Sequence, residues 1–227
     1  MNDTSSPRIV ALILAGGTGT RVGNERPKQY LEYGGESILA RTLRSFRDQV
    51  DEILVVCRDE WADYVRAQAP FVRTVTAGTT GYESLTHGID ALTATPSDTF
   101  VMIHDAVRPF VTPAIIADNL RVARAQGNAI TAVPTYETLL HATDGTGTAR
   151  HMTRREDVYR AQTPQTFRLA SLRQMLADAR ALCINDAQSA CTLACQLGYE
   201  LHLSEGDIKN FKITTTTDLQ LYEALIS

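Results

Sequence analysis

The feature that most constrains this chain is a glycine-rich loop that directly follows an apolar run. Residues 9–15 are rich in β-branched side chains and lead into Gly16-Gly17-Thr18-Gly19-Thr20-Arg21-Val22-Gly23. Such a run predicts a buried parallel strand that ends in a tight loop. Glycines let backbone N–H groups face anionic oxygens, and Arg21 and Lys28 add positive charge, so this loop is predicted to bind a triphosphate.

Two better-known glycine loops are excluded by spacing. A dinucleotide loop needs G-x-G-x-x-G, whereas Gly17, Gly19 and Gly23 fall one position too far apart. A P-loop needs Gly-Lys-Ser or Gly-Lys-Thr, and the chain contains neither. A plain turn between a strand and a helix stays open as the alternative for the loop taken alone.

Composition predicts one ordinary globular domain over residues 1–227. The 227 residues are 44% hydrophobic and 21% charged, and the net charge of −4 without basic runs disfavours nucleic acid or an anionic membrane as a partner. No apolar stretch approaches about 18 residues, and Met1 to Ser6 lack the layout of a signal peptide, so a cytoplasmic protein is expected. The four cysteines are expected to be buried free thiols, because no C-x-x-C occurs and no histidine stands at ligand spacing.

The order of apolar segments predicts an α/β fold with a doubly wound, mostly parallel sheet. Strands are expected over residues 8–14, 52–57, 72–76, 99–104 and 129–133, and helices over 37–47, 60–68, 186–197 and 217–226. Ligands bind such sheets beyond the carboxyl ends of the strands. The glycine loop, the Gly78 loop and Asp105 are therefore predicted to share one site.

Residues 134–161 interrupt this alternation. Pro134 and the turn Asp144-Gly145-Thr146-Gly147 predict a β-arm that projects from the sheet, with a flexible surface loop as the alternative. An isolated two-stranded hairpin is only marginally stable, so the arm predicts a homodimer.

Asp105 follows a predicted buried strand in Ile103-His104-Asp105-Ala106-Val107-Arg108-Pro109. A carboxylate at this place is a hard oxygen ligand suited to Mg²⁺ bound to phosphates. The alternative is structural, with Asp105 capping a turn and pairing with Arg108.

Four separated motifs together resemble one enzyme family. They are the glycine loop with Pro27-Lys28-Gln29, the segment His104 to Pro109, the segment Gln162 to Phe167, and Glu205-Gly206-Asp207 followed by Asn210 to Thr214. In this order they look like the cytidylyltransferases that act on methylerythritol phosphate or ribitol 5-phosphate, and the match spans about residues 8–225. The resemblance implies a Rossmann-like nucleotidyltransferase fold, CTP as substrate and Mg²⁺ as cofactor.

The resemblance also implies roles for individual residues. The catalytic cations would be Arg21, Lys28 and Lys212, with Lys212 between the α-phosphate and the attacking phosphate. The nucleotide would lie against Ala15, Gly16, Gly17, Thr18, Gly19, Ala77, Gly78, Thr79, Ser84, Asp105, Ala106 and Arg108, with Asp105 also at the metal. The acceptor would contact Glu137, Thr138, Arg155 and Thr163, the first three carried on an arm that reaches the neighbouring subunit's site.

The predicted reaction needs no general base, because a phosphate monoester is already anionic at neutral pH. It needs charge neutralisation and in-line positioning. The arm's start, Pro134 to Leu140, lacks the two cations typical of the erythritol type, which favours D-ribitol 5-phosphate as acceptor and CDP-ribitol as product. Methylerythritol 4-phosphate is the alternative acceptor. An inactive nucleotide-binding module is a third interpretation, supported by Gly81 where the family commonly has arginine.

Overall fold

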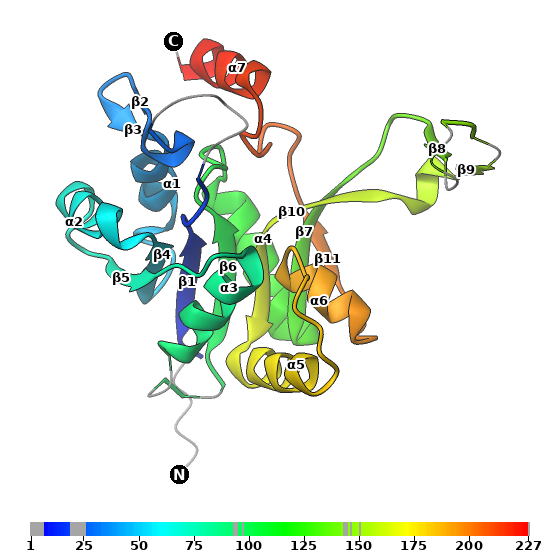
Figure 1. Ribbon diagram of the computed structural model, residues 1–227, viewed down its shortest axis with the longest axis horizontal. Helices are drawn as coiled ribbons and strands as arrows, with labels where there is room; N and C mark the ends of the chain where they lie inside the picture. The colour runs from blue at the N-terminus through cyan, green and yellow to red at the C-terminus, as the bar shows by residue number, and fades with distance from the viewer. Residues whose placement is uncertain are drawn as a thin grey trace.

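One mixed sheet of seven strands forms the centre of the molecule (Figure 1). The computed structural model describes residues 7–18, 26–92, 95–96, 98–142, 145, 147–149 and 151–226. The strands run in the order β11-β7-β10-β6-β1-β4-β5. Their bounds are β1 (Ile9–Leu14), β4 (Glu52–Cys57), β5 (Arg73–Thr76), β6 (Phe100–Asp105), β7 (Asn128–Pro134), β10 (Tyr159–Arg168) and β11 (Leu203–Glu205). All pairs are parallel except those of β10, which runs antiparallel to both β6 and β7.

Helices cover both faces of this sheet, as predicted. On β1, Val10 and Leu12 enter one apolar core while Ala11 and Ile13 enter the other, because successive side chains of a strand point to opposite faces. One face is covered by α3 (Gly81–Asp90), α5 (Leu169–Ala181) and α6 (Ala190–Gln196). The other is covered by α1 (Ile38–Phe46), α2 (Asp59–Gln68) and α4 (Pro113–Gln126). The mostly parallel, doubly wound α/β prediction is therefore confirmed.

Smaller elements complete the body. The turn η2 (Lys28–Tyr30) leads into the hairpin of β2 (Glu32–Tyr33) and β3 (Glu36–Ser37). Gly34 and Gly35 form its two-residue turn with φ of 60° and 80°, a backbone region that glycine adopts at little cost. The C-terminal α7 (Thr216–Ile226) buries Leu219 and Tyr222 against Ile38 and Ile213. Over the described residues, no helix has both the length and the apolar character needed to cross a membrane.

Several elements differ from the sequence prediction, among them two strands of the central sheet and one helix. Strand β10 was not predicted, because its buried stretch contains Gln162, Thr163 and Gln165, and polar side chains there hide the apolar alternation. The short edge strand β11 was also missed. The helix expected over 186–197 begins only at Ala190, since Ser189 takes an extended backbone and its hydroxyl accepts the N–H of Thr192 as an N-cap.

The cysteine prediction was right in chemistry and partly wrong in burial. All four thiols are free, and Cys57 is buried in β4. Cys183 and Cys195 are exposed, however, and Cys191 is half-buried. Cys183 follows α5 with a φ of 57°, and Cys195 faces away from the core side of the short α6, so neither is covered.

A two-stranded arm projects from the body over residues 134–161 (Figure 1). Strand β8 (Leu139–His141) pairs antiparallel with β9 (His151–Thr153). The arm is rooted in the sheet, because Pro134 at the end of β7 pairs with Tyr159 at the start of β10. Of the predicted turn, Asp144 and Thr146 lie outside the described residues.

Gly88 provides a test of the packing beneath α3. A Cβ at this position would lie 2.6 Å from Leu12 Cδ1 and 3.0 Å from Val56 Cγ2, both of them buried side chains. We expect Gly88→Val to lower the free energy of unfolding by about 2 kcal/mol through overpacking. Urea denaturation would measure it, with Gly81→Ala as the matched control. Gly81 also lies in α3, but its nearest neighbour would be 3.7 Å away, so a comparable loss in the control would contradict this explanation.

Candidate active site

A cavity of about 330 Å³ opens where β1 and β6 end. We call it the first cavity. It brings together most of the residues predicted to bind a nucleotide. Those that line it are Ala15, Gly16, Gly17, Thr18, Lys28, Gly78, Thr79, Ser84, Asp105, Ala106 and Lys212. Gly19 and Arg21 lie outside the described residues, so their predicted roles stay predictions.

The described part of the glycine loop is shaped by Gln29. Its side-chain Nε2 donates to the carbonyl oxygens of Ala15 and Gly17, each at 2.7 Å. Gly16 is required at its position, since a Cβ there would lie 2.6 Å from the Cβ of Ala77. Ala77 therefore packs behind the loop and is not among the described residues that line the cavity. Gln29 belongs to the Pro27-Lys28-Gln29 motif, but sequence reasoning gave it no role.

Another part of the cavity lining is the Gly78 loop, which is bonded to the first turn of α3. The Gly78 N–H donates to Ser84 Oγ at 3.1 Å, and the Ser84 hydroxyl donates to the Thr80 carbonyl at 2.9 Å. Glu83 accepts from both the hydroxyl and the backbone N–H of Thr79, and these bonds hold the pKa of Glu83 below its ordinary value. Glu83 and Ser84 thus support this loop without an arginine at Gly81. The predicted contact of Ser84 with cytosine stays a prediction.

Asp105 joins two cations at the end of β6. Its Oδ1 lies 2.9 Å from Lys212 Nζ, and its Oδ2 lies 2.9 Å from Arg108 Nε. Burial would raise the pKa of Asp105, but the charges of Lys212 and Arg108 outweigh it and hold that pKa well below the ordinary value. Arg108 also donates through Nη1 to the carbonyl of Asn210 at 2.8 Å. The structural alternative for Asp105, pairing with Arg108, is thus present in the molecule.

A second cavity of about 290 Å³ adjoins the first. Both are lined by Asp105, Lys212, Gly81 and Gln188, so these residues form the wall between them. Polar residues supply much of the rest of the second lining, namely His104, Arg108, Thr163, Gln165, Ser189, Cys191 and Thr192. Lys212 stands where contents of the two cavities would meet, and its side chain is 42% exposed.

Several residues that line the first cavity were given no role from the sequence, among them Arg58 and Gln188. Arg58 lines it, with Nε 3.4 Å from the carbonyl oxygen of Gly16. Because Arg58 directly follows β4, the rule that ligands gather at carboxyl ends of strands was a signal that pointed to it. Gln188 lies in the irregular segment before α6, and no sequence pattern indicated it.

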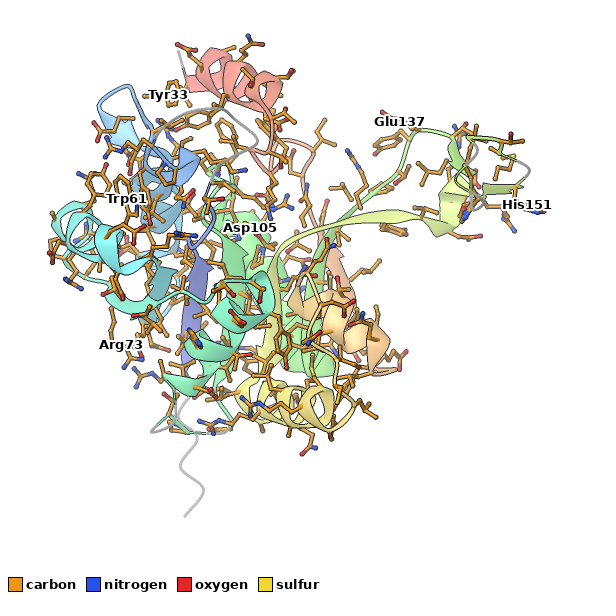
Figure 2. The ribbon with its side chains drawn as sticks, viewed as in Figure 1. Tyr33, Trp61, Arg73, Asp105, Glu137 and His151 are labelled. Atoms are coloured by element: carbon orange, nitrogen blue, oxygen red, sulfur yellow. The ribbon has the colours of Figure 1, made fainter. Side chains whose placement is uncertain are left out.

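The arm residues lie elsewhere. None of Glu137, Thr138 and Arg155 is among the described residues that line either cavity. Figure 2 shows Glu137 on the projecting arm, well apart from Asp105 in the body. Arg155 begins the short turn η3 (Arg155–Asp157), where it is exposed and pairs with the adjacent Glu156 at 3.4 Å. Within one chain, therefore, the structure does not bring these three residues to the site.

The described residues of the first cavity do not form a resident metal site. Asp105 is the only carboxylate among the described residues lining the first cavity, and each of its oxygens already accepts from a cation. In the described part of the chain, no three His, Cys, Asp or Glu side chains gather as a metal-binding group. Mg²⁺ is commonly held by one or two carboxylates together with substrate phosphates, so a nucleotide would have to supply most of its ligands here.

Comparison with known proteins places the chain in a family. The family model described as "IspD: 2-C-methyl-D-erythritol 4-phosphate cytidylyltransferase" matches residues 9–227. The chain is 34% identical to a ribitol-5-phosphate cytidylyltransferase of Vibrio parahaemolyticus, over 96% of this chain and 95% of the relative. It is 37% identical to a 2-C-methyl-D-erythritol 4-phosphate cytidylyltransferase of Geotalea uraniireducens, over 96% of this chain and 97% of the relative.

A solved structure agrees with these matches. The 2-C-methyl-D-erythritol 4-phosphate cytidylyltransferase of Thermus thermophilus superposes with a TM-score of 0.78 at 33% identity, covering 96% of this chain and 98% of that one. The resemblance stated from the four motifs is thereby confirmed. The chain belongs to the IspD family and is a CTP-dependent cytidylyltransferase.

Proposed function

We propose that the enzyme transfers CMP from CTP to D-ribitol 5-phosphate, forming CDP-ribitol and pyrophosphate. The observation that carries the proposal is the wall of Asp105 and Lys212 shared by the two cavities. CTP occupies the first cavity, between the glycine loop and the Gly78 loop. The acceptor occupies the second, and its phosphate meets the α-phosphate at Lys212.

The reaction joins two anions. An oxygen of the acceptor phosphate attacks the α-phosphorus, and the bond from that phosphorus to the bridging oxygen of the β-phosphate breaks. Pyrophosphate leaves with the electron pair. Lys212 neutralises charge between the two reacting phosphates, while Lys28 and Arg58 add positive charge to the triphosphate cavity. Asp105 and Arg108 keep Lys212 and the Asn210 segment in place before substrate arrives.

Magnesium enters as part of the substrate in this proposal. Bound to the triphosphate, it would neutralise charge on the nucleotide, and Asp105 is the one carboxylate of the described cavity lining that could add a ligand. We expect calorimetric titration of the enzyme with Mg²⁺ alone to give no binding heat. With a non-hydrolysable CTP analogue present, Mg²⁺ should tighten nucleotide binding. Stoichiometric binding of Mg²⁺ to the free enzyme would contradict this prediction.

Ribitol phosphate is supported by the arm and by the second cavity. Tyr136 and Leu140 at the arm's start are 72% and 67% exposed, and they stand where the erythritol type carries cations. Hydroxyl and amide groups line the second cavity, as a polyol with many hydroxyls requires. Methylerythritol 4-phosphate is the second candidate, favoured by the family model and by relatives that carry that name.

The direct test is a pyrophosphate-release assay with CTP and a panel of alditol phosphates. We expect turnover with ribitol 5-phosphate, with mass spectrometry identifying CDP-ribitol. Substituting ATP, GTP or UTP under the same conditions provides the control for nucleotide choice. No pyrophosphate release with any acceptor would contradict the proposal.

The proposal includes a homodimer that works in the cytoplasm. The arm exposes Tyr136, Leu140, Met152 and Tyr159, large side chains that a second copy of the chain would cover. Its cation Arg155 is exposed and is not among the described residues that line its own chain's cavities, which suits a role at the partner's acceptor phosphate.

Subunit mixing tests the shared site. Arg155→Ala and Lys28→Ala should each be nearly inactive, because each spoils both sites of its homodimer. After subunit exchange at equal amounts, half of the dimers are mixed and each holds one intact site, so about a quarter of wild-type activity is expected. Mixing Arg155→Ala with itself is the control. No recovery after confirmed exchange, or a monomer by light scattering, would refute the shared site.

A further inference from the structure

His104 lies beside the second cavity, and no step of the proposed reaction uses it. It belongs to β6, its side chain is fully buried, and its ring packs against Phe46 with centroids 4.9 Å apart. Both ring nitrogens have partners. Nε2 lies 3.3 Å from the carbonyl oxygen of Arg108, and Nδ1 lies 2.9 Å from Thr163 Oγ1.

These partners determine where the ring carries its proton. A carbonyl oxygen can only accept, so Nε2 must be the protonated nitrogen. The ring is fully buried against Phe46, and its two nitrogens face only a carbonyl and a hydroxyl, so burial keeps it neutral at physiological pH. A neutral imidazole with its proton on Nε2 has a bare Nδ1, which can only accept.

The hydroxyl of Thr163 is therefore fixed in direction. It donates its proton to Nδ1 of His104, while its oxygen accepts the backbone N–H of Asp105 at 3.1 Å. A hydroxyl has one proton and two lone pairs. After these two bonds, Thr163 has a single lone pair left for anything in the second cavity, which it lines.

The surrounding backbone leaves this hydroxyl little freedom to turn elsewhere. The Thr163 carbonyl accepts from Asn210 Nδ2 at 2.9 Å, and the carbonyl of Pro164 accepts from Asn119 Nδ2 at 3.1 Å. Asn119 and Asn210 are both fully buried. Thr163 is thus held through its own carbonyl and that of Pro164 as well as through its own side chain.

We propose that His104 is a positioning residue, which turns the Thr163 proton away from the second cavity so that Thr163 binds a hydroxyl group of the acceptor and not its phosphate. A phosphate monoester dianion has no proton to donate, whereas every alditol hydroxyl has one. The proposal rests on the proposed function for the identity of the acceptor. Thr163 then accepts a hydrogen bond from one hydroxyl group of the acceptor, and the cations bind the acceptor's phosphate.

The proton position can be tested without any substrate. In the free enzyme labelled with ¹⁵N-histidine, long-range ¹H–¹⁵N spectra distinguish a protonated ring nitrogen from a bare one. The chain has five histidines, and loss of one set of signals in His104→Asn identifies the right ring. We expect a neutral ring protonated on Nε2. Protonation on Nδ1 would overturn the proposal, because the Thr163 proton would then be free to point into the cavity.

The hydroxyl contact is tested with monodeoxy analogues of whichever alditol phosphate is turned over. One analogue should lose about tenfold in kcat/KM with the wild type, the scale of one neutral hydrogen bond. Thr163→Val should raise the acceptor KM about tenfold with a smaller change in kcat, and that analogue should then lose nothing further. Thr163→Ser, which keeps the hydroxyl, should restore the discrimination.

Variants of His104 separate positioning from packing. His104→Asn keeps an acceptor near the place of Nδ1 and should retain the preference for the intact acceptor, whereas His104→Leu should lose it. If each monodeoxy analogue loses the same factor in kcat/KM with the wild type as with Thr163→Val, the proposal is overturned. If no alditol phosphate is turned over, the proposed function fails, and the NMR result still decides where the proton lies.

Discussion

Replacing Lys212 with alanine is expected to slow turnover about a hundredfold, or about 3 kcal/mol of lost transition-state stabilisation. Lys212 lines both cavities and bonds Asp105, so in the proposed reaction it stands where two phosphates of like charge come together. Its loss should appear mainly in kcat, because the glycine loop and Lys28 still bind the triphosphate. Steady-state kinetics with saturating CTP and acceptor would measure it.

Lys209 offers a matched control for this variant. It is an exposed lysine of the same segment and lies outside the described lining of both cavities. Lys209→Ala removes an equal charge three residues from Lys212. It should leave kcat within about twofold of wild type, because dissolved salt screens exposed charges. If Lys212→Ala keeps half of the wild-type turnover, Lys212 has no place in the mechanism.

The second large effect concerns the choice of acceptor. We expect kcat/KM for D-ribitol 5-phosphate to exceed that for methylerythritol 4-phosphate by at least about 100-fold, the scale on which sites built for hydroxyl groups reject analogues lacking them. Competition between the two acceptors in one reaction, followed by mass spectrometry of both products, gives this ratio directly. An equal or reversed ratio would end the ribitol assignment and leave cytidyl transfer intact.

A variant of the arm bears on the same ratio. Tyr136 and Leu140 stand where the erythritol type has cations, and both are exposed for contact with a second chain. Leu140→Lys should move the ratio toward methylerythritol 4-phosphate, while Leu182→Lys, at an exposed leucine outside both the arm and the described cavity lining, should not.

The parallel core could be predicted because its strands are apolar throughout. The segment 52–57 matches β4 residue for residue, and 99–104 differs from β6 by one position at each end. Strand β10 could not be predicted, for the opposite reason. Its central side chains are polar and bond to Asn210, Asp207 and His104, contacts between residues far apart in the sequence. Local pattern carries no information about such partners.

The same difference between local patterns and long-range contacts explains which residues of the candidate site could be predicted. Lys28 and Asp105 were found because they follow predicted strands, and Lys212 was found because it stands in a motif of the family resemblance. The structure brings all three to one cavity. The hydrogen bond between His104 and Thr163 could not be predicted, since it joins residues 59 positions apart. The arm's contribution could not be placed either, because one chain does not contain the surface that the arm is proposed to meet.

The root of the arm has a consequence for how two copies of the chain could fit together. Strands β7 and β10 both run out of the central sheet into the arm, and beyond their pairing the Thr135 N–H still donates to the Val158 carbonyl at 3.0 Å. A ladder of this kind transmits the right-handed twist of the sheet from residue to residue. The twist of the central strands therefore sets the direction in which the arm leaves the body. A partner subunit would have to meet the arm at that angle.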